Sequence, residues 1–160
     1  MQITTDIADE AFLRAFTEAV ERYWHVDENG HTFRTRVDLE RISPMALYCR
    51  EATPGEACAP PARGSAVDLA THIGFFPPGR AVLTTGASTL HVTGGRTIAL
   101  GPHGVTPRSL AHEFGHILSF DDGYVRGYRD VGDEGFRVLE LVLDPGNIMS
   151  APASGQLTEV

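Results

Sequence analysis

The residues best placed to do chemistry form the segment HEFGH at positions 112–116, and Asp122 follows six residues after its second histidine. In a helix, residues i and i+4 lie one above the other on the same face. His112 and His116 could therefore share one metal ion. Glu113 would lie about 100° round the helix, within reach of a metal-bound water. The pattern indicates a zinc hydrolase.

The surroundings of this motif predict a helix over residues 107–119. Thr106 is a suitable N-cap, and Pro107 fits the first helical position, where no N–H is lost. Chance alone produces HExxH about once in fifty chains of this composition, so the helical context adds weight to the motif. The apolar positions recur at helical spacing: Leu110, Ala111, Phe114, Ile117 and Leu118.

A catalytic zinc usually has three protein ligands and one open position for water. In the pattern HExxHxxGxxH, the chain bends so that the residue six places after the second histidine returns to the metal. Here the sequence reads HEFGHILSFDD, which puts Asp122 at that position.

At these residues the chain resembles the metzincin clan of zinc endopeptidases, and within it the small snapalysin-type proteases, whose third ligand is an aspartate. Metzincins also carry a methionine-containing turn beneath the zinc, and Asn147-Ile148-Met149-Ser150 resembles one. The resemblance covers about residues 107–150. It implies one catalytic zinc held by His112, His116 and Asp122, with Met149 in a structural role.

Three features depart from the metzincin pattern. Ser119 replaces the glycine of the bend, where a left-handed backbone would cost serine about 1–2 kcal/mol. Only 11 residues follow Met149, too few for the longer helix that usually ends the fold. No upstream pro-segment with a latency cysteine or aspartate is evident.

Other acidic residues are rival third ligands. Asp121 is one residue off the spacing and fits better as a solvated neighbour or a partner to a ligand. Glu134 or Glu140 would serve in a gluzincin-type site, and Asp130 in an aspzincin-type one. Asp122 is preferred because the Met149 turn corroborates it.

If zinc is present, Glu113 would act as the general base for water attacking a peptide carbonyl. Tyr124 and Tyr128 are candidate hydrogen-bond donors to the developing oxyanion. Substrate would lie extended along a strand edge within residues 80–93. The remaining histidines lack ligand spacing and are expected to be surface or hydrogen-bonded residues, although His103 could line the cleft: His25, His31, His72, His91 and His103.

The hydrophobic pattern predicts an α+β fold with a mixed, twisted sheet. An amphipathic helix is expected over residues 6–24, capped by Thr5 or Asp6. Glycines 94 and 95 suggest a two-residue hairpin turn. Strands are predicted at 33–39, 67–73, 80–85, 88–93, 96–100 and 136–144, with an irregular stretch before residue 135 and a turn at 145–150.

The chain has 160 residues, which fits a single domain over 1–160. We expect an upper part at 1–106, the active-site segment at 107–122 and a lower, irregular part at 123–160. Cys49 and Cys58 flank a loop with a Pro54-Gly55 turn and could form a disulfide, or could remain two separate thiols.

A net charge of −8 argues against nucleic acid as a partner. No apolar run is long enough to span a membrane, and the N-terminus lacks a signal-peptide pattern. The protein is expected to be secreted, as a mature or excised piece such as a toxin or effector module, or else cytoplasmic.

We expect a monomer acting on proteins or peptides, with any pro-segment or inhibitor outside this chain. A metal-stabilised binding domain without turnover is the alternative, against which Glu113 argues.

Overall fold

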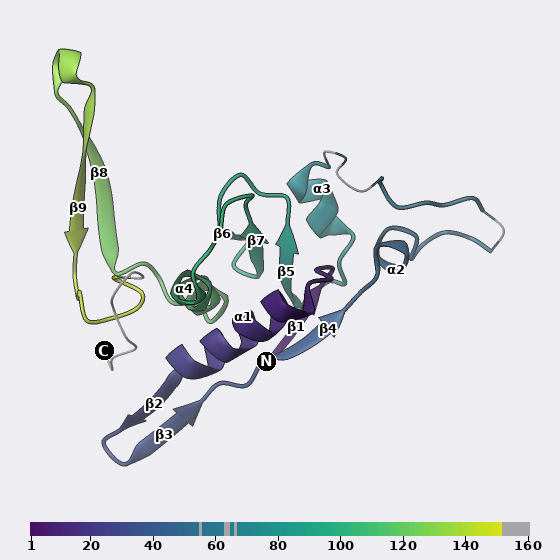
Figure 1. Ribbon diagram of the computed structural model, residues 1–160, viewed down its shortest axis with the longest axis horizontal. Helices are drawn as coiled ribbons and strands as arrows, with labels where there is room; N and C mark the ends of the chain where they lie inside the picture. Colours follow the sequence, from purple (N-terminus) through teal and green to yellow (C-terminus); the bar gives the residue numbers. More distant parts are fainter. Residues whose placement is uncertain (55, 63–64, 66, 152–160) are drawn as a thin grey trace.

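The centre of the molecule is a five-stranded sheet with strand order β4-β1-β5-β7-β6 (Figure 1). A computed structural model describes residues 1–54, 56–62, 65 and 67–151. Four strands run parallel: β1 (Gln2–Thr5), β4 (Asp38–Arg41), β5 (Ala81–Thr85) and β7 (Thr97–Leu100). The edge strand β6 (His91–Thr93) is antiparallel to β7. The predicted α+β class and mixed sheet are confirmed.

Two long helices cover one face of this sheet. Helices α1 (Glu10–Tyr23) and α4 (Pro107–Ile117) pack against each other and against Ile3, Leu83 and Ile98 of the sheet. The same core cluster continues to Ile148 and Met149 near the end of the described chain. The central sheet and the turn at Ile148 and Met149 therefore share one hydrophobic core.

The start of α1 differs from the prediction. Residues 2–5 form strand β1, and the N-cap is Asp9, whose carboxylate accepts hydrogen bonds from the amides of Ala11 and Phe12, both at 3.0 Å. The expected caps, Thr5 and Asp6, lie before the helix because strand pairing with β4 and β5 uses the first five residues.

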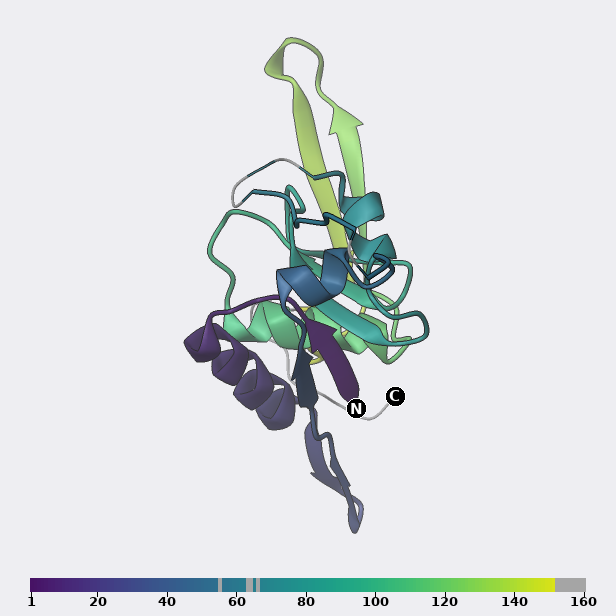
Figure 2. The same cartoon turned by 90° about the vertical axis from the view of Figure 1, so that its right-hand side faces the viewer.

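Two short helices cover the opposite face, as the two views in Figures 1 and 2 show. Helix α2 (Pro44–Tyr48) and the segment after α3 (Leu69–Gly74) bury Leu47 and Phe76 against Val82. The strand predicted over 67–73 is wrong. Asp68 accepts a hydrogen bond from the amide of Thr71 at 2.9 Å and so caps a helix.

Two hairpins extend from the body of the molecule. Strands β2 (His25–Glu28) and β3 (His31–Arg34) are joined at Asn29-Gly30, where both residues have positive φ. The single strand expected over 33–39 is divided between β3 and β4. The turn between β6 and β7 holds three residues rather than two, since Thr93 pairs with Thr97.

The second hairpin, β8 (Tyr124–Asp130) and β9 (Phe136–Val142), projects far from the sheet (Figure 1). A short 3-10 turn, η1 (Gly132–Glu134), joins its strands. The strand predicted at 136–144 is confirmed, but the irregular stretch expected before it is wrong. Strand β8 carries little alternation of its own and is ordered by backbone pairing with β9. Within the described residues, no helix is both long and apolar enough to cross a membrane.

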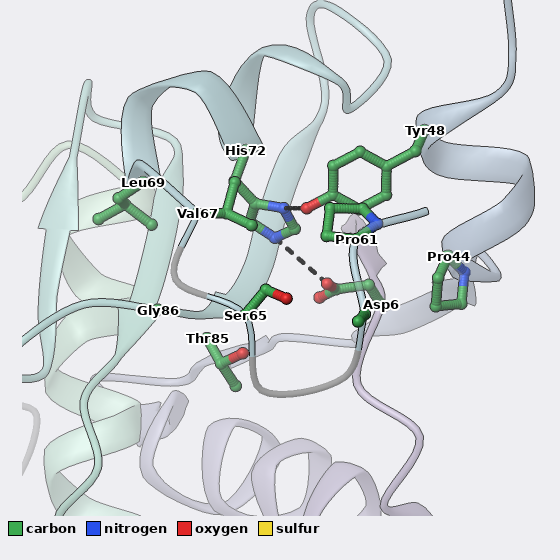
Figure 3. Close-up of a pocket in the computed structure, with 11 residues that line it drawn as sticks. Asp6, Pro44, Tyr48, Pro61, Ser65, Val67, Leu69, His72, Thr85 and Gly86 are labelled. Carbon is green, nitrogen blue, oxygen red and sulfur yellow. Dashed lines mark hydrogen bonds and ion pairs between the residues drawn. The ribbon is translucent and has the colours of Figure 1, made fainter. Parts of the chain in front are cut away.

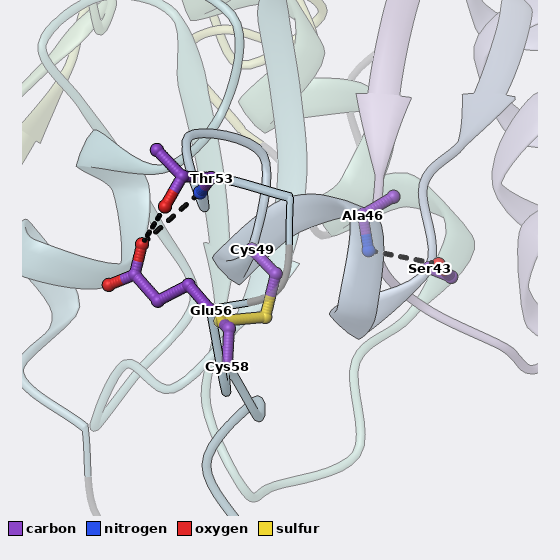
Figure 4. The surroundings of a disulfide bond; sticks show 6 residues. All are labelled: Ser43, Ala46, Cys49, Thr53, Glu56 and Cys58. Carbon is purple, nitrogen blue, oxygen red and sulfur yellow. Dashed lines mark hydrogen bonds between the residues drawn. A yellow bond between two sulfur atoms is a disulfide. The ribbon is translucent and has the colours of Figure 1, made fainter.

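The two cysteines form a disulfide, Cys49–Cys58, with their Cα atoms 5.9 Å apart (Figure 4). The bridge closes a loop that follows α2, which Ser43 caps through the amide of Ala46. Inside the loop, Glu56 accepts hydrogen bonds from the amide and hydroxyl of Thr53. These bonds hold the pKa of Glu56 below its usual value. In the chain-entropy model such a small loop contributes about 2–3 kcal/mol.

Candidate metal centre

Helix α4 carries the HEFGH segment and begins where the sequence predicts. The hydroxyl of Thr106 accepts a hydrogen bond from the amide of Ser109 at 3.1 Å, and Pro107 is the first helical residue. His112 is buried, whereas His116 is partly exposed. The two imidazole rings lie 4.9 Å apart between centroids, on the same face of the helix.

Backbone carbonyl groups orient both imidazoles. Nδ1 of His112 lies 3.0 Å from the carbonyl oxygen of Ile148, and Nδ1 of His116 lies 2.8 Å from that of Phe120. A carbonyl oxygen only accepts, so each Nδ1 must carry the proton and donate it. In the neutral form each ring then has its lone pair on Nε2, which is the atom that faces Asp122.

The chain reverses sharply after α4. The amide of Ser119 donates to the carbonyl of His116, and the amide of Phe120 donates to that of Gly115, both at 3.0 Å. This pair of bonds is a Schellman motif, which requires a left-handed residue after the helix. Ser119 occupies that position with φ 71°. Ser119 therefore has the left-handed backbone that the metzincin pattern predicts for this position, although serine disfavours that conformation.

The bend brings Asp122 back to the histidines. Its Oδ1 lies 3.2 Å from Nε2 of His112 and 3.4 Å from Nε2 of His116. All three ligand atoms lie within 4.8 Å of one another, so this His-His-Asp group could hold a metal ion. In the part of the chain that the structure describes, no other three His, Cys, Asp or Glu side chains converge in this way.

The rival ligands do not join the group. Asp121 lines the same cavity without contributing to the triad. Glu140 lies on β9 and pairs with Arg126 of β8 at 2.7 Å. Asp130 and Glu134 lie near the tip of the hairpin, at the end of β8 and in η1.

The turn around Met149 lies directly against α4. The side chain of Asn147 accepts from the amide of Met149 at 2.9 Å, and the carbonyl of Met149 accepts from the amide of Gly123 at 3.0 Å. The first bond shapes the turn, and the second ties it to the residue after Asp122. Met149 is 5% exposed and belongs to the main core. The turn thus supports His112 through the Ile148 carbonyl and Asp122 through Gly123.

Trp24 is a structural partner of the centre that sequence reasoning missed. Its indole N–H donates to the carbonyl of Ala111 at 2.7 Å, and its ring packs 5.2 Å from Phe120 and 6.1 Å from Phe114. Trp24 follows α1 directly, so it joins the N-terminal helix to the helix that carries the histidines. The only signal in the sequence is a lone tryptophan at the end of an amphipathic helix.

A cavity of about 590 Å³ opens beside the three ligand atoms. Glu113 lines it, and burial raises the pKa of this carboxyl, against the opposing influence of His112 and His116. Leu90, His91 and Val92, in and just before β6, also line the cavity.

His91, which was expected to be a surface or hydrogen-bonded residue, also lines this cavity. Its Nδ1 lies 3.0 Å from the carbonyl of Thr89, which fixes the ring. Its charge acts to lower the pKa of Glu113, so the two side chains are electrostatically coupled. His103, considered as a cleft residue, is not part of the lining.

The two tyrosines have different positions. Tyr124 lines the cavity and lies nearly parallel to the His112 ring, at 6.4 Å between centroids. Burial, with a further contribution from Asp122, raises the pKa of Tyr124, so the phenol keeps its proton. Tyr128 is 70% exposed on the projecting hairpin and does not line the cavity.

In comparisons with known proteins, no family model, no curated protein sequence and no solved structure matches the chain.

Proposed function

We propose that the protein is a zinc-dependent endopeptidase that hydrolyses peptide bonds at the cavity beside His112, His116 and Asp122. The observation that carries this proposal is the convergence of two Nε2 atoms and one carboxylate oxygen, while each Nδ1 is placed to donate to a backbone carbonyl. With neutral imidazoles these three atoms are all acceptors, and a cation bound between them would satisfy all three lone pairs.

The spacing of the ligand atoms is compatible with zinc. Zinc binds histidine nitrogen and carboxylate oxygen at about 2.0–2.2 Å, usually with tetrahedral geometry, so two ligand atoms lie about 3.3 Å apart. The two distances from Asp122 Oδ1 to the imidazole nitrogens, 3.2 and 3.4 Å, agree with this value. The hydrogen bonds on the outer imidazole nitrogens are the supporting contacts typical of zinc sites.

Zinc in such a site supplies Lewis acidity, which lowers the pKa of a water to about 7 and polarises a carbonyl group. Glu113, next to His112 on the same helix, accepts the proton of the attacking water and then donates it to the leaving amine. The raised pKa of Glu113 suits a group that must hold a proton between these two events. Tyr124, a neutral phenol in the same cavity, can donate a hydrogen bond to the developing oxyanion.

Strand β6 is the surface on which we infer that the substrate binds. It is the last strand of the five-stranded sheet and, among the residues that the structure describes, pairs only with β7. An extended peptide can add to such an edge through main-chain hydrogen bonds. Since Leu90, His91 and Val92 line the cavity, a peptide on this edge would pass beside Glu113.

Three features favour a metzincin-type arrangement for this enzyme. The third ligand is six residues beyond the second histidine, the chain bends through a left-handed residue at Ser119, and Met149 packs under the histidine helix. The Cys49–Cys58 disulfide favours an exported protein, because disulfides persist mainly in oxidising compartments.

The test combines zinc analysis with digestion of casein by the wild type and Glu113→Gln. We expect about one zinc per chain in both proteins, with casein cleavage by the wild type and none by Glu113→Gln. Glu18→Gln, an exposed glutamate on α1, is the matched control and should retain turnover. Zinc-loaded wild type that cleaves neither casein nor a peptide library would contradict the proposal, as would undiminished cleavage by Glu113→Gln.

A further inference from the structure

Phe120 and Asp121 line the cavity beside the three metal ligands, but the chemistry proposed above uses neither side chain. Both residues directly precede the third ligand in the sequence. Their backbone is held to the histidine helix: the amide of Phe120 donates to the carbonyl of Gly115, and the carbonyl of Phe120 lies 2.8 Å from Nδ1 of His116. The two side chains are therefore fixed next to the place where a substrate would react.

The carboxylate of Asp121 has no counter-charge in this cavity. Among the residues that the structure describes, Asp121 takes part in no ion pair, and the cavity lining contains no lysine or arginine. Asp122 and Glu113, by contrast, together balance the two charges of a zinc ion. The zinc-loaded cavity would therefore carry an excess negative charge at Asp121.

The basic residues nearest to this point do not neutralise Asp121. Arg126 is the closest arginine in the sequence, and its Nε and Nη2 lie 3.0 and 2.7 Å from Oε2 of Glu140. Residues 152–160 contain no lysine or arginine. Arg63 is outside the described residues, two positions before Ser65, and Ser65 lines a separate cavity beside α2 and α3 on the other face of the sheet (Figure 3). These positions leave the charge of Asp121 available to a substrate.

Phe120 supplies an aromatic surface beside this charge. It is 45% exposed, and its ring packs 5.2 Å from that of Trp24, which the carbonyl of Ala111 holds in place. The core thus supports one part of the Phe120 ring and leaves the rest accessible. An aromatic ring next to a carboxylate suits arginine or lysine, because the methylene stem packs on apolar surface and the cation interacts with both groups.

We propose that the cavity selects substrates with a basic side chain next to the cleaved peptide bond, and that Asp121 recognises its charge. This inference rests on the proposed peptidase function and names its substrate class. The Asp121 carboxylate can accept two N–H groups of a guanidinium side by side, or those of an ammonium. The hydroxyl of Ser119, which lines the same cavity, can accept a further N–H. An acidic side chain would be repelled, which adds to the selectivity.

Two capped peptides test the charge preference. Both consist of alanine and leucine around one central residue, which is either arginine or citrulline, its uncharged analogue of similar shape. At pH 8 an ordinary histidine is uncharged, so His91 adds no competing charge. We expect the zinc-loaded wild type to cleave the arginine peptide with a kcat/KM about fivefold higher than that for the citrulline peptide. Mass spectrometry of the products should place arginine next to the cleaved bond.

Three variants assign the preference to Asp121. Asp121→Asn removes the charge from an exposed position and should bring the ratio of the two kcat/KM values close to one. Asp121→Glu keeps the charge and should retain most of the preference. Asp38→Asn changes the net charge equally on β4, at the opposite edge of the sheet from β6, and should keep the wild-type ratio. Structural damage alone would lower both rates together and leave the ratio unchanged.

Binding to zinc-loaded Glu113→Gln separates this inference from the peptidase function, because it needs no turnover. Calorimetric titration should show the arginine peptide binding about fivefold more tightly than the citrulline peptide. Such selective binding, combined with no cleavage of casein or of either peptide by the wild type, would contradict the peptidase function and support the charge recognition.

Equal kcat/KM values for the two peptides in the wild type would overturn the inference while the peptidase function stands. An unchanged preference in Asp121→Asn would do the same. If the wild type cleaves neither peptide, equal affinities of the two peptides for Glu113→Gln would overturn the inference.

Discussion

Met149 occupies the space that a side chain on Gly115 would need. A Cβ atom at Gly115 would lie 2.3 Å from Sδ of Met149 and 2.6 Å from Cζ2 of Trp24. Gly115 lies between the two histidines of α4, and Ile148, next to Met149, orients His112 through its carbonyl. The helix, the methionine turn and Trp24 are therefore packed together at the one residue of HEFGH that has no side chain.

Gly115→Ala is expected to destabilise the protein by about 1–3 kcal/mol, as overpacked cores do. It should also weaken zinc binding, because displacement of Met149 moves the Ile148 carbonyl away from His112. Thermal unfolding and zinc titration would measure the two effects. Gly74→Ala is the matched control, since Gly74 ends helix α3 with nothing within 4 Å of a Cβ. An equal loss in both variants would show that the close packing is not the cause.

Asp122→Ala should lower zinc affinity by a factor of about ten or more, since it removes one of three ligands. Asp121→Ala removes the same charge from the same cavity and should leave zinc affinity nearly unchanged. Competition with a chelator of known affinity measures both constants. The opposite ranking would assign the third ligand to Asp121.

The ionised side chain of Glu113 is expected to lower the free energy of unfolding of the metal-free protein. Burial raises its pKa above the ordinary value, so the folded state favours the neutral carboxyl and the unfolded state the charged one. The penalty is therefore absent below the ordinary pKa and fully present above the folded one. Glu113→Gln should raise the melting temperature at pH 7–8 in EDTA, and this gain should vanish near pH 4. A gain that grows as the pH falls would show the opposite sign of the shift.

Ser119→Gly should stabilise the protein by up to about 1–2 kcal/mol, because Ser119 has φ 71° and glycine adopts this conformation without a Cβ clash. Ser119→Ala keeps the Cβ and removes only the hydroxyl, so it should give no such gain. Denaturant unfolding of the two variants separates backbone strain from side-chain effects. Equal stabilisation by alanine would exclude strain as the explanation.

His91→Ala should reduce kcat/KM by about tenfold while zinc content stays the same, if His91 contacts the substrate in the cavity that Glu113 also lines. His31→Ala, in the exposed strand β3, provides the control for loss of a histidine. Steady-state kinetics on one fluorogenic peptide would compare them. Unchanged kcat/KM in His91→Ala would remove this residue from the substrate-binding surface.

The parts of the site that the sequence predicts are those that local geometry determines. Thr106 and Pro107 start a helix from their own chemistry, and the spacing of His112 and His116 places them on one face of it. The bend at Ser119 and the return of Asp122 involve only residues next to the helix end. Helix capping and i,i+4 geometry depend on a few neighbouring residues, so they can be read from the order of amino acids alone.

The surroundings of these ligands depend on tertiary structure. The orientation of His112 requires the carbonyl of Ile148, which is 36 residues away, and the packing of α4 requires Trp24, which is 87 residues from Ala111. His91 enters the cavity only because β6 pairs at the sheet edge beside α4. The helix at 69–74 is an exception, because its cap at Asp68 is a local feature that the prediction of a strand over 67–73 overlooked. Contacts between distant residues arise from the folded chain as a whole, so no local pattern contains them.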